Sequence, residues 1–235
     1  MDKKVVVVLP AFNCEQTLGK VLSDIPLGTI DDIVLVDDCS SDRTVRVAHS
    51  LGIENVYVHD TNKGYGANQK TCYTKALELG ADLIIMLHPD YQYDPKLIPD
   101  IIAQFDNGAD AVFASRMSHG FDAVRLGMPL YKYLANRFLT LLQNRALSLH
   151  LSEYHTGYRA FSSNVLRQID YMGLDDDFIF DNEIIIEMHI RGFRISEIYC
   201  PAKYDNDASS INLRKSIRYG IGVLKNTFKY LLDKK

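Results

Sequence analysis

Three side chains that can bind a divalent cation follow the apolar run Leu83–Leu87 at alternate positions. They are His88, Asp90 and Gln92, which offer an imidazole nitrogen, a carboxylate and an amide oxygen. Because successive side chains of an extended segment point to opposite sides, alternate ones would point the same way. This donor set suits Mg²⁺ or Mn²⁺ better than Zn²⁺, and such cations typically share their coordination shell with substrate phosphates. The segment therefore predicts a metal site beside a nucleotide ligand.

The same segment also allows a structural interpretation. Pro89, Asp90, Asp94 and Pro95 are residue types that build turns and cap helices. A carboxylate that follows a strand can therefore serve the backbone instead of a metal. The residues alone leave both interpretations open.

Adjacent carboxylates follow a second strand-like run, Asp32–Val36. Asp37 and Asp38 repel each other at that strand end and need a partner. With Ser40 and Asp42 they carry the groups needed to hydrogen bond a nucleobase or ribose, or to cap the following helix. Asp42 taken singly favours the cap, whereas the adjacent pair is harder to explain in that way.

A glycine-containing loop, Asn62–Asn68, opens the next helical stretch. Glycine lets a ligand approach the backbone, and a helix N-terminus attracts anions, so a nucleotide could bind here. The chain contains neither the Walker phosphate-binding pattern nor the glycine fingerprint of dinucleotide-binding folds. An ordinary dehydrogenase is therefore disfavoured.

The elements that must position these residues alternate between short β-branched runs and helical stretches, which is typical of βαβ units and a mainly parallel sheet. In such a sheet, ligands bind at the carboxyl ends of the strands. Strands are expected at Val5–Leu9, Asp32–Val36, Asn55–His59, Leu83–Leu87, Ala111–Ala114 and Arg194–Ile198. Helices are expected at Glu15–Ile25, Asp42–Leu51, Gly66–Glu78, Pro95–Phe105, Leu130–Leu149 and Asp181–Arg191.

The composition excludes several classes of protein. A chain of 235 residues with 47% hydrophobic residues can bury a large core as one domain, and its net charge of −4 argues against a general nucleic-acid binder. The four cysteines form no CxxC pair, so neither a zinc site nor a disulfide framework is expected. The sequence shows no signal-peptide core and no apolar run of about 18 to 20 residues, so we expect a cytoplasmic protein.

The C-terminal stretch, from about Asn212 to Leu232, is expected to form an amphipathic helix. Its apolar positions recur at spacings of four and three and share one stripe: Ile217, Ile221, Leu224, Phe228 and Leu231. Its basic positions lie on one flank of that stripe: Arg214, Arg218, Lys225 and Lys229. Such a helix can lie on anionic lipid. Packing of the stripe on the protein's own domain is the commoner arrangement, and the sequence favours it.

Taken in order, four motifs resemble glycosyltransferase family 2, whose members are inverting enzymes with a GT-A fold. The motifs are Pro10-Ala-Phe-Asn13, Val36-Asp-Asp-x-Ser-x-Asp-x-Thr44, Asn62-Lys-Gly-x-Gly-x-Asn68 and His88-Pro-Asp-x-Gln-x-Asp-Pro95. Within the family, residues 4–205 resemble the polyprenyl-phosphate sugar transferases of the dolichol-phosphate mannose synthase type. Three later markers support this: Ala114-Ser-Arg116, the pair Asn136 and Arg137, and Thr156-Gly-Tyr-Arg159.

The resemblance implies an α/β GT-A domain over residues 1–205, with a single Rossmann-like, mainly parallel sheet flanked by helices. Residues 1–115 would bind the nucleotide-sugar and residues 116–205 the acceptor, and residues 206–235 would add the amphipathic helix. The implied activity is that of an inverting, metal-dependent hexosyltransferase using Mg²⁺ or Mn²⁺. It would transfer a sugar from a donor of the GDP-mannose or UDP-glucose type to polyprenyl phosphate.

The resemblance also implies roles for individual residues. The nucleotide-sugar would contact Pro10, Ala11, Asn13, Asp37, Asp38, Lys63, Gly64 and Asn68. The metal would be held by Asp90 and Gln92, with His88 where the family usually has the first carboxylate of Asp-x-Asp. An acceptor phosphate would be bound by Lys132, Arg137 and Arg159 together with Arg116, since arginine suits phosphate. The expected catalytic residues are Asp90, Arg116, Asp181 and Glu183.

The two acidic residues Asp181 and Glu183 matter only for one kind of acceptor. A sugar hydroxyl needs a carboxylate base to take its proton, whereas an acceptor phosphate is already ionised. The family usually has an arginine shortly after the last sheet strand, but Pro201–Ser210 contains none, so Lys203 or Arg214 would have to compensate.

The departures from the family pattern leave several alternatives open. One is a family 2 transferase acting on a soluble glycan or a protein hydroxyl. Another is a non-catalytic nucleotide-binding subunit whose metal site has failed at His88. A sugar-nucleotide nucleotidyltransferase is disfavoured, because the expected glycine- and arginine-rich loop after the first strand is missing. A polyprenyl acceptor would bring the protein to the cytoplasmic face of a membrane as a peripheral protein.

Overall fold

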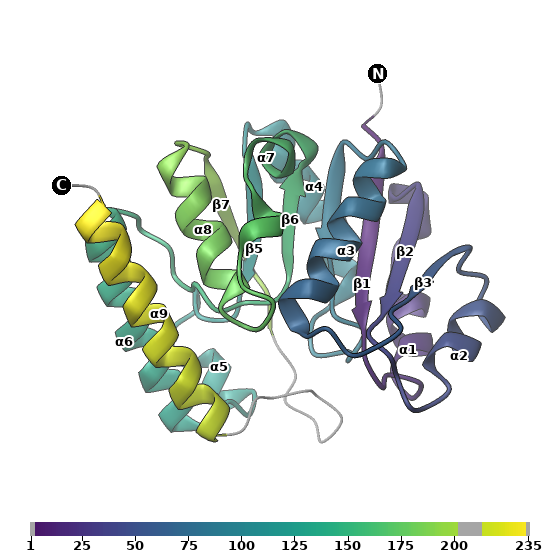
Figure 1. Ribbon diagram of the computed structural model, residues 1–235, viewed down its shortest axis with the longest axis horizontal. Coiled ribbons are helices and arrows are strands. Elements are labelled where there is room, and N and C mark those ends of the chain that lie inside the picture. Colours follow the sequence, from purple (N-terminus) through teal and green to yellow (C-terminus); the bar gives the residue numbers. More distant parts are fainter. Residues whose placement is uncertain (1–2, 202–212, 234–235) are drawn as a thin grey trace.

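The computed structural model describes residues 3–201 and 213–233. Within these ranges the chain builds a seven-stranded sheet in the order β3-β2-β1-β4-β6-β5-β7 (Figure 1). The strands are β1 (Val5–Ala11), β2 (Asp32–Asp37), β3 (Asn55–Val58), β4 (Leu83–Met86), β5 (Ala111–Ser115), β6 (Arg159–Ser162) and β7 (Ile195–Tyr199). The expected strands are confirmed, with ends that differ by one or two residues.

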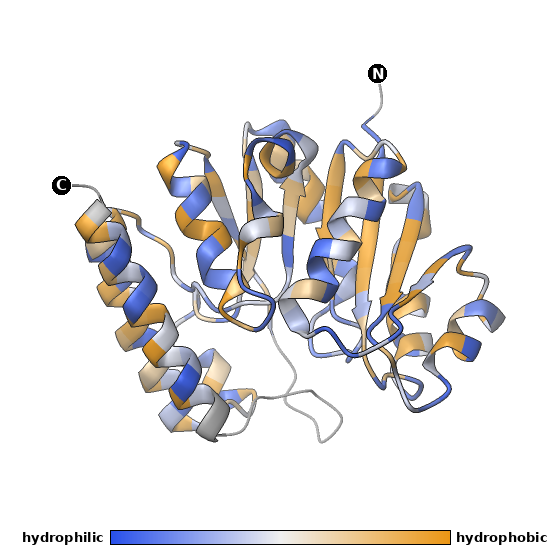
Figure 2. Ribbon diagram, in the orientation of Figure 1, coloured by the Kyte–Doolittle hydropathy of each residue, from blue (hydrophilic) through white to orange (hydrophobic). Residues whose placement is uncertain are grey.

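The sheet is mainly parallel, as its sequence predicts. Strand β1 lies between β2 and β4 and is parallel to both, with Val8 opposite Val34 on one side and Met86 on the other. Every residue of β1 is buried, and Figure 2 shows the strand in the hydrophobic colour along its length. A continuous apolar run of this kind is typical of a parallel strand that is covered on both faces.

Strand β6 is the main feature of the sheet that the sequence did not reveal. It lies between β4 and β5 and is antiparallel to both. With only four residues, Arg159–Ser162, it is too short for a period of two to be recognised. Its insertion joins β5 and β7 to the rest of the sheet.

Helices cover both faces of the sheet and make two cores. Helices α1 (Leu18–Asp24), α2 (Thr44–Ser50) and α4 (Ile98–Asp106) pack on one face. Helices α3 (Tyr65–Glu78), α7 (Ser163–Gln168) and α8 (Phe180–Ile190) pack on the other. The stretch expected to be one helix from Pro95 begins instead with the 3-10 turn η2 (Pro95–Leu97), which Asp94 caps by accepting a hydrogen bond from the Lys96 amide at 3.0 Å. Two short 3-10 turns, η1 (Leu27–Thr29) and η3 (Tyr171–Gly173), complete this part of the chain.

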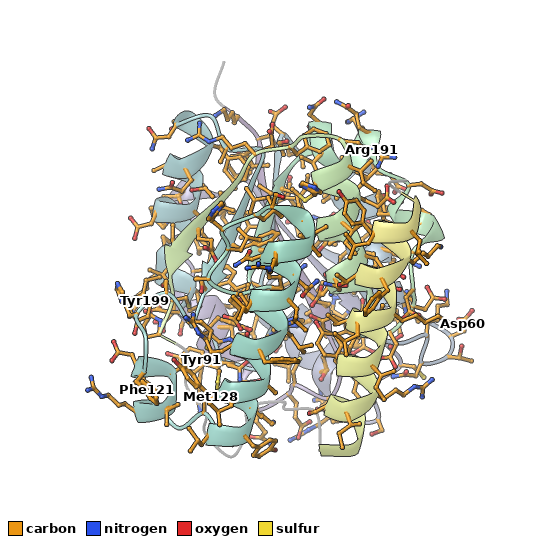
Figure 3. The ribbon with its side chains drawn as sticks, turned by 90° about the vertical axis from the view of Figure 1, so that its left-hand side faces the viewer. Asp60, Tyr91, Phe121, Met128, Arg191 and Tyr199 are labelled. Atoms are coloured by element: carbon orange, nitrogen blue, oxygen red, sulfur yellow. The ribbon has the colours of Figure 1, made fainter. Side chains whose placement is uncertain are left out.

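Three further helices are α5 (Asp122–Arg125), α6 (Leu130–Leu147) and α9 (Leu213–Asp233). Figure 3 shows α6 and α9 side by side on one edge of the molecule, and the two helices are in contact. The expected C-terminal helix is therefore present. The segment 202–212 that precedes α9, including Lys203, lies outside the described residues.

Helix α9 contacts the rest of the protein through its polar and aromatic residues. Val223 and Thr227 are buried, Asn226 donates a hydrogen bond to Glu183 at 3.1 Å, and the Tyr230 hydroxyl lies 3.1 Å from His189. The apolar stripe faces outward.

The exposed fractions of three residues of the stripe are 57% for Ile217, 63% for Ile221 and 65% for Phe228. The helix does pack on its own domain, as favoured, but it does so with these residues of the stripe exposed. Even so, no helix among residues 3–201 and 213–233 combines the length and hydropathy that crossing a membrane requires.

Candidate active site

The loops that follow β1 and β2 are joined by hydrogen bonds at the carboxyl end of the sheet. The Asn13 amide donates to the Ser40 hydroxyl at 2.8 Å, and the Asn13 side chain accepts from the Ser41 amide at 2.8 Å. Thr44 accepts from the Cys14 amide at 2.8 Å. Asn13 therefore fixes the two loops relative to each other, beside the ends of both strands.

The paired carboxylates find the partners that their repulsion requires within the protein. Asp37 accepts from the amide and the hydroxyl of Ser40, at 2.8 and 2.5 Å. Asp38 lies 2.7 Å from His59 and accepts from the backbone amides of Lys63 and Gly64, at 2.8 and 3.0 Å. Asp38 thus holds the glycine-containing loop against the end of β2.

Helix α3 is tied to the same sheet edge. The side-chain amide of Asn68 donates to the carbonyls of Ala11 and Val36, at 3.3 and 3.1 Å. The structure therefore brings together the eight residues expected to contact the nucleotide-sugar: Pro10, Ala11, Asn13, Asp37, Asp38, Lys63, Gly64 and Asn68. Their contacts with a nucleotide stay a prediction. Asp42 accepts from the amide and hydroxyl of Thr44, at 2.9 and 2.6 Å, but it is not the expected cap, because the N-cap position of α2 is Arg43.

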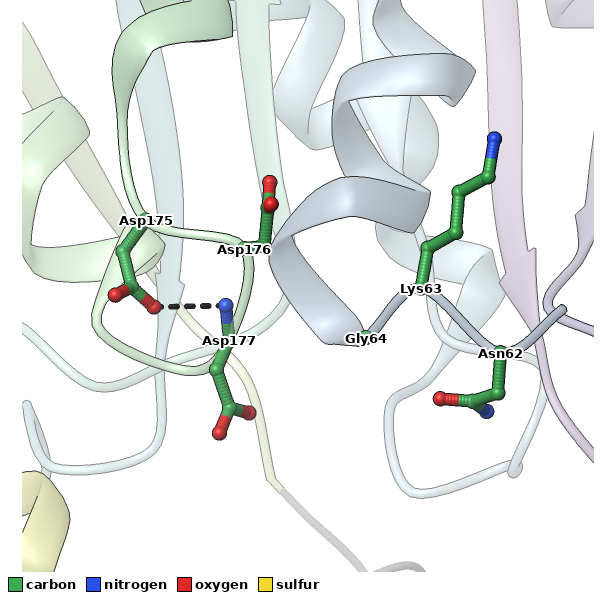
Figure 4. Close-up of a pocket in the computed structure, with 6 residues that line it drawn as sticks. All are labelled: Asn62, Lys63, Gly64, Asp175, Asp176 and Asp177. Carbon is green, nitrogen blue, oxygen red and sulfur yellow. Dashed lines mark hydrogen bonds between the residues drawn. The ribbon is translucent and has the colours of Figure 1, made fainter.

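The glycines of this loop allow a second chain segment to approach. The backbone amides of Gly66 and Ala67 donate to the Asp176 carbonyl, at 2.8 and 3.1 Å. A Cβ atom at Gly66 would lie 2.6 Å from the Asp175 carbonyl oxygen. A pocket of about 290 Å³ lies between this acidic segment and Lys63, lined by Asn62, Lys63, Gly64, Asp175, Asp176 and Asp177 (Figure 4).

The chain does not continue as a strand after Met86. It turns at Pro89 and Asp90, and Tyr91 has a positive φ of 60°. The Asp90 carboxylate accepts from the Gln92 amide at 3.0 Å, which closes the turn. The expectation that His88, Asp90 and Gln92 project together from an extended segment is therefore wrong, and the turn interpretation describes the backbone correctly.

The three expected metal ligands lie on this one turn, at positions 88, 90 and 92. Burial lowers the pKa of His88, and the charges of Asp90 and then Asp181 oppose that shift. In the described ranges no group of three or more His, Cys, Asp or Glu side chains could hold a metal ion. Two such ligands and an amide, with substrate phosphates or water completing the shell, fit the chemistry of Mg²⁺ or Mn²⁺.

Asp181 lies at the centre of a polar cluster formed with Tyr65, Gln69 and Arg159. Its carboxylate accepts from the Tyr65 hydroxyl at 2.8 Å and from the Gln69 amide at 3.2 Å, and it lies 3.5 Å from the Arg159 guanidinium. The Tyr65 oxygen is in turn 3.1 Å from Nε2 of His88. Sequence reasoning identified Asp181 and His88 but missed Tyr65, which connects them.

Glu183 lies apart from Asp181 although both belong to the first turns of α8. Its carboxylate accepts from the Asp175 amide at 2.6 Å and from the Asn226 side chain on α9. It therefore holds the acidic segment and the C-terminal helix. Between the two expected bases, the structure places only Asp181 beside His88.

Glu153 is the carboxylate that balances Arg116, and sequence reasoning missed it. Glu153 is fully buried and accepts from the Arg116 side chain at 3.0 Å, the Arg116 amide at 2.9 Å and the Asn136 amide at 2.9 Å. Burial raises the pKa of Glu153, but the Arg116 charge and these hydrogen bonds hold it below its usual range. Arg116 is thus fixed in place by a carboxylate 37 residues away in the sequence.

The structure separates the three residues expected to bind an acceptor phosphate. The pKa of Lys132 is lowered by partial burial and by the charge of Arg116. Arg137 is exposed on the outer side of α6. Arg159 is fully buried and donates to the carbonyls of Thr156, Tyr154 and Asp181. This burial argues against a phosphate-binding role for Arg159. Its guanidinium lies beside the Asp181 carboxylate instead.

His155 and Tyr219 connect this site to the C-terminal helix. His155 Nδ1 lies 2.7 Å from the Tyr219 hydroxyl of α9. The Nε2 atom of His155 is buried and has no hydrogen-bond partner in the part of the chain that the structure describes. Burial lowers the pKa of His155 to about 4. Neither residue carried a sequence motif that could have revealed this contact.

Comparison with known proteins identifies the family. Residues 6–170 match the family model described as glycosyl transferase family 2. The chain belongs to glycosyl transferase family 2. It is therefore a glycosyltransferase, and the resemblance seen in the motifs is confirmed.

Family members with assigned names resemble this glycosyltransferase over most of their length. The dolichyl-phosphate hexose transferase of Haloferax volcanii is 26% identical in sequence. The alignment covers 90% of this chain and 91% of the relative's chain. The UDP-N-acetylglucosamine–dolichyl-phosphate N-acetylglucosaminyltransferase of Methanococcus voltae is 28% identical and shares 71% of this chain and 72% of its own.

A solved structure shows the same fold at low sequence identity. Glucosyl-3-phosphoglycerate synthase from Mycobacterium tuberculosis, in complex with Mn²⁺ and UDP-glucose, is 17% identical. It covers 97% of this chain and 79% of its own, with a TM-score of 0.73. The expected GT-A fold of this glycosyltransferase is thus confirmed.

Removal of the Glu153 charge should destabilise this transferase strongly. The change Glu153→Gln leaves the Arg116 charge inside the protein without its balancing carboxylate, which typically costs about 3 to 5 kcal/mol. The matched control is Glu187→Gln on α8, whose pair with Arg191 is partly exposed. That change should cost no more than about 0.5 kcal/mol. Urea denaturation of both variants measures the difference, and equal losses would contradict the buried pair.

The lowered pKa of His155 should make stability fall in mild acid. The unfolded chain takes up a proton below the ordinary value of 6.5, whereas the folded protein does so only near 4, so acidification in this window favours unfolding. From pH 7 to pH 5 the loss due to His155 should be about 1 to 2 kcal/mol. His155→Gln should lack this component. Denaturation curves at both pH values test it, and identical losses in the two proteins would refute the assignment.

Proposed function

We propose that this glycosyltransferase moves a sugar, with inversion, from a nucleotide-sugar to a polyprenyl phosphate, with Mg²⁺ or Mn²⁺ as cofactor. The observation that carries the proposal is the exposed apolar face that α6 and α9 present. Lys132 lies on α6, and the charge of Arg116 contributes to lowering its pKa. A cation suits a phosphate, and an exposed apolar face suits a lipid chain.

The donor would bind at the carboxyl ends of β1 and β2. Asn13, Asp37 and Asp38 are fixed there by the loops that follow these strands. In this proposal the nucleoside lies against them, and His88, Asp90 and Gln92 hold the metal. A divalent cation, when bound, neutralises charge on the departing diphosphate. The names of the relatives, which act on dolichyl phosphate, support a phosphate acceptor.

The surroundings of Asp181 also favour a phosphate acceptor over a hydroxyl. A general base must have a lone pair directed at the proton that it removes. The Asp181 carboxylate already accepts from Tyr65 and Gln69 and faces Arg159. An acceptor phosphate is ionised at neutral pH and needs no base, so this engagement of Asp181 costs nothing in catalysis.

Helices α6 and α9 would bring the protein to the membrane surface. Their exposed apolar residues are Leu130, Leu134, Phe138 and Leu141 on α6 and Ile217, Ile221, Phe228, Leu231 and Leu232 on α9. The basic flank of α9 includes Arg218, Lys225 and Lys229, while the side chain of Arg214 lies outside the described part. A helix with apolar and basic faces is suited to lie on anionic lipid.

The function can be tested directly with a panel of donors. The protein is incubated with UDP- and GDP-sugars, polyprenyl phosphate and either cation, and lipid-linked product is separated from water-soluble product by organic extraction. Sugar in the organic phase is expected for one donor. Transfer only to a soluble glycan or peptide would replace the lipid acceptor, and donor binding with no transfer would indicate a non-catalytic subunit.

Asp90→Asn should lower the transfer rate by a factor of about 100 or more, because it removes the charge that would hold the cation. Asparagine keeps an oxygen that can accept from the Gln92 amide, so the turn and the fold should persist. The matched control is Asp100→Asn at an exposed position of α4, which should leave the rate unchanged. Rates are compared at saturating metal. A fully active Asp90→Asn variant would refute the metal assignment.

The basic flank of α9 should drive binding to anionic vesicles. Each cation near an anionic surface contributes about 1 kcal/mol, so replacing Arg214, Arg218, Lys225 and Lys229 by Gln should weaken binding about 1,000-fold. The control with equal charge change replaces Lys3, Lys20, Arg46 and Lys96, which are exposed and outside α9. Co-sedimentation at low salt measures both. Failure of the unchanged protein to bind such vesicles would contradict a membrane-facing α9.

A further inference from the structure

His88 lies in a slot that the surrounding residues form for an imidazole ring. Its ring is stacked on that of Tyr65, with a distance of 5.4 Å between the ring centroids. On the chain segment before β6, Gly157 leaves the necessary space, because a Cβ atom there would lie 2.6 Å from His88 Nε2. The Tyr93 hydroxyl accepts from the Gly157 amide at 2.9 Å and so holds this glycine in place. The segments that contain Tyr65 and Gly157, both distant from His88 in sequence, thus surround its ring.

The hydrogen bonds of Tyr65 determine which nitrogen of His88 carries the proton. A tyrosine hydroxyl has one proton, and a carboxylate only accepts. The Tyr65 proton therefore goes to Asp181 at 2.8 Å, and the Tyr65 oxygen must accept from Nε2 of His88 at 3.1 Å. This assignment puts the proton of the neutral imidazole on Nε2. The lone pair is then on Nδ1, to which no residue in the ranges 3–201 and 213–233 donates a hydrogen bond.

Asp181 is itself held so that it can serve this purpose. Gln69 donates to its other oxygen at 3.2 Å, and the Arg159 guanidinium lies 3.5 Å away. A carboxylate that orients a histidine through the second ring nitrogen is a common feature of metal sites, where it fixes the tautomer and the ring direction. Here the Tyr65 hydroxyl stands between the carboxylate and the imidazole.

We propose that Tyr65 is a positioning residue that presents Nδ1 of His88 to the divalent cation, and that the resulting site prefers Mn²⁺ to Mg²⁺. The proposal rests on the metal site of the proposed function. An imidazole nitrogen suits transition metals, whereas Mg²⁺ prefers oxygen ligands only. The replacement of the usual carboxylate by His88 is therefore a change in metal preference, with Tyr65, Gly157 and Asp181 arranged to support it.

Metal binding rather than activity provides the decisive test. Mn²⁺ is titrated into the protein with UDP or GDP present, the free ion is followed by electron paramagnetic resonance, and Mg²⁺ is added as competitor. Pulsed measurements of the bound Mn²⁺ should reveal a nitrogen coupling from His88. His88→Asp should remove this coupling and shift the Mn²⁺ over Mg²⁺ preference toward Mg²⁺ by about tenfold or more.

Tyr65→Phe should weaken Mn²⁺ binding about 10- to 100-fold, the usual effect of removing a group that orients a metal ligand. The matched control is Tyr171→Phe, which removes a buried tyrosine hydroxyl whose partner is Thr74, at 3.0 Å, and not a residue around His88. It should change Mn²⁺ affinity by less than about threefold. Circular dichroism checks that all variants are folded.

The outcomes separate this inference from the proposed function. An absent nitrogen coupling, or an unchanged metal preference in His88→Asp, overturns the role of His88. Equal losses in Tyr65→Phe and Tyr171→Phe overturn the role of Tyr65. Transfer to polyprenyl phosphate with no nitrogen coupling would leave the function intact and refute only the inference. Nitrogen-coupled Mn²⁺ without any sugar transfer would support the inference and refute the function.

Discussion

The burial of Arg159 constrains the arrangement of the whole active site. A guanidinium without access to water is stable only if its donors are all satisfied and its charge is balanced. Three backbone carbonyls and the Asp181 carboxylate meet these needs, and the Phe113 ring lies 4.9 Å from the guanidinium carbon. Arg159 begins β6, so the antiparallel strand, the segment before it and the start of α8 are all fixed by one cation.

The same constraint extends to the residues of the proposed metal site. Because Arg159 holds Asp181, Asp181 can hold Tyr65, and Tyr65 can hold His88 at the end of β4. The antiparallel direction of β6, between β4 and β5, brings Arg159 to this position. Running from Arg159 to Ser162, β6 begins at the edge where the parallel strands end, and its first residue therefore lies below the site.

The fold could be predicted from the sequence where the signal is local. Strands such as β1 are continuous apolar runs, and helices such as α3 follow recognisable loops, so the GT-A architecture could be expected from motifs in order. The contacts that complete the site are not local. Tyr65 and Asp181 are 116 residues apart, and Arg116 and Glu153 are 37 apart. No periodicity reports such pairs, because each depends on how separate elements meet in space.

The orientation of α9 shows a similar limit. Its apolar stripe was recognised from the spacing, but a stripe predicts only that one face differs from the other. Which face packs inward depends on individual contacts, and here Tyr219, Asn226 and Tyr230 each meet a polar partner on the domain. These bonds explain how a helix can dock by its polar side. They also account for the apolar residues that remain exposed to water. Such exposure is unfavourable in free energy unless another surface covers these residues.

These two observations together limit the kinds of acceptor that suit the protein. A soluble sugar acceptor would require a free base, yet Asp181 is engaged by three groups and Glu183 is directed toward α9. A soluble acceptor would also not explain why the apolar faces of α6 and α9 are exposed. In the proposed function the acceptor is a lipid phosphate, which needs no base and would lie in the surface that such faces can enter. The contact between His155 and Tyr219 would then connect the membrane-facing helix to the site. His155 contacts Tyr219 on α9, and its carbonyl accepts a hydrogen bond from Arg116, which is paired with Glu153.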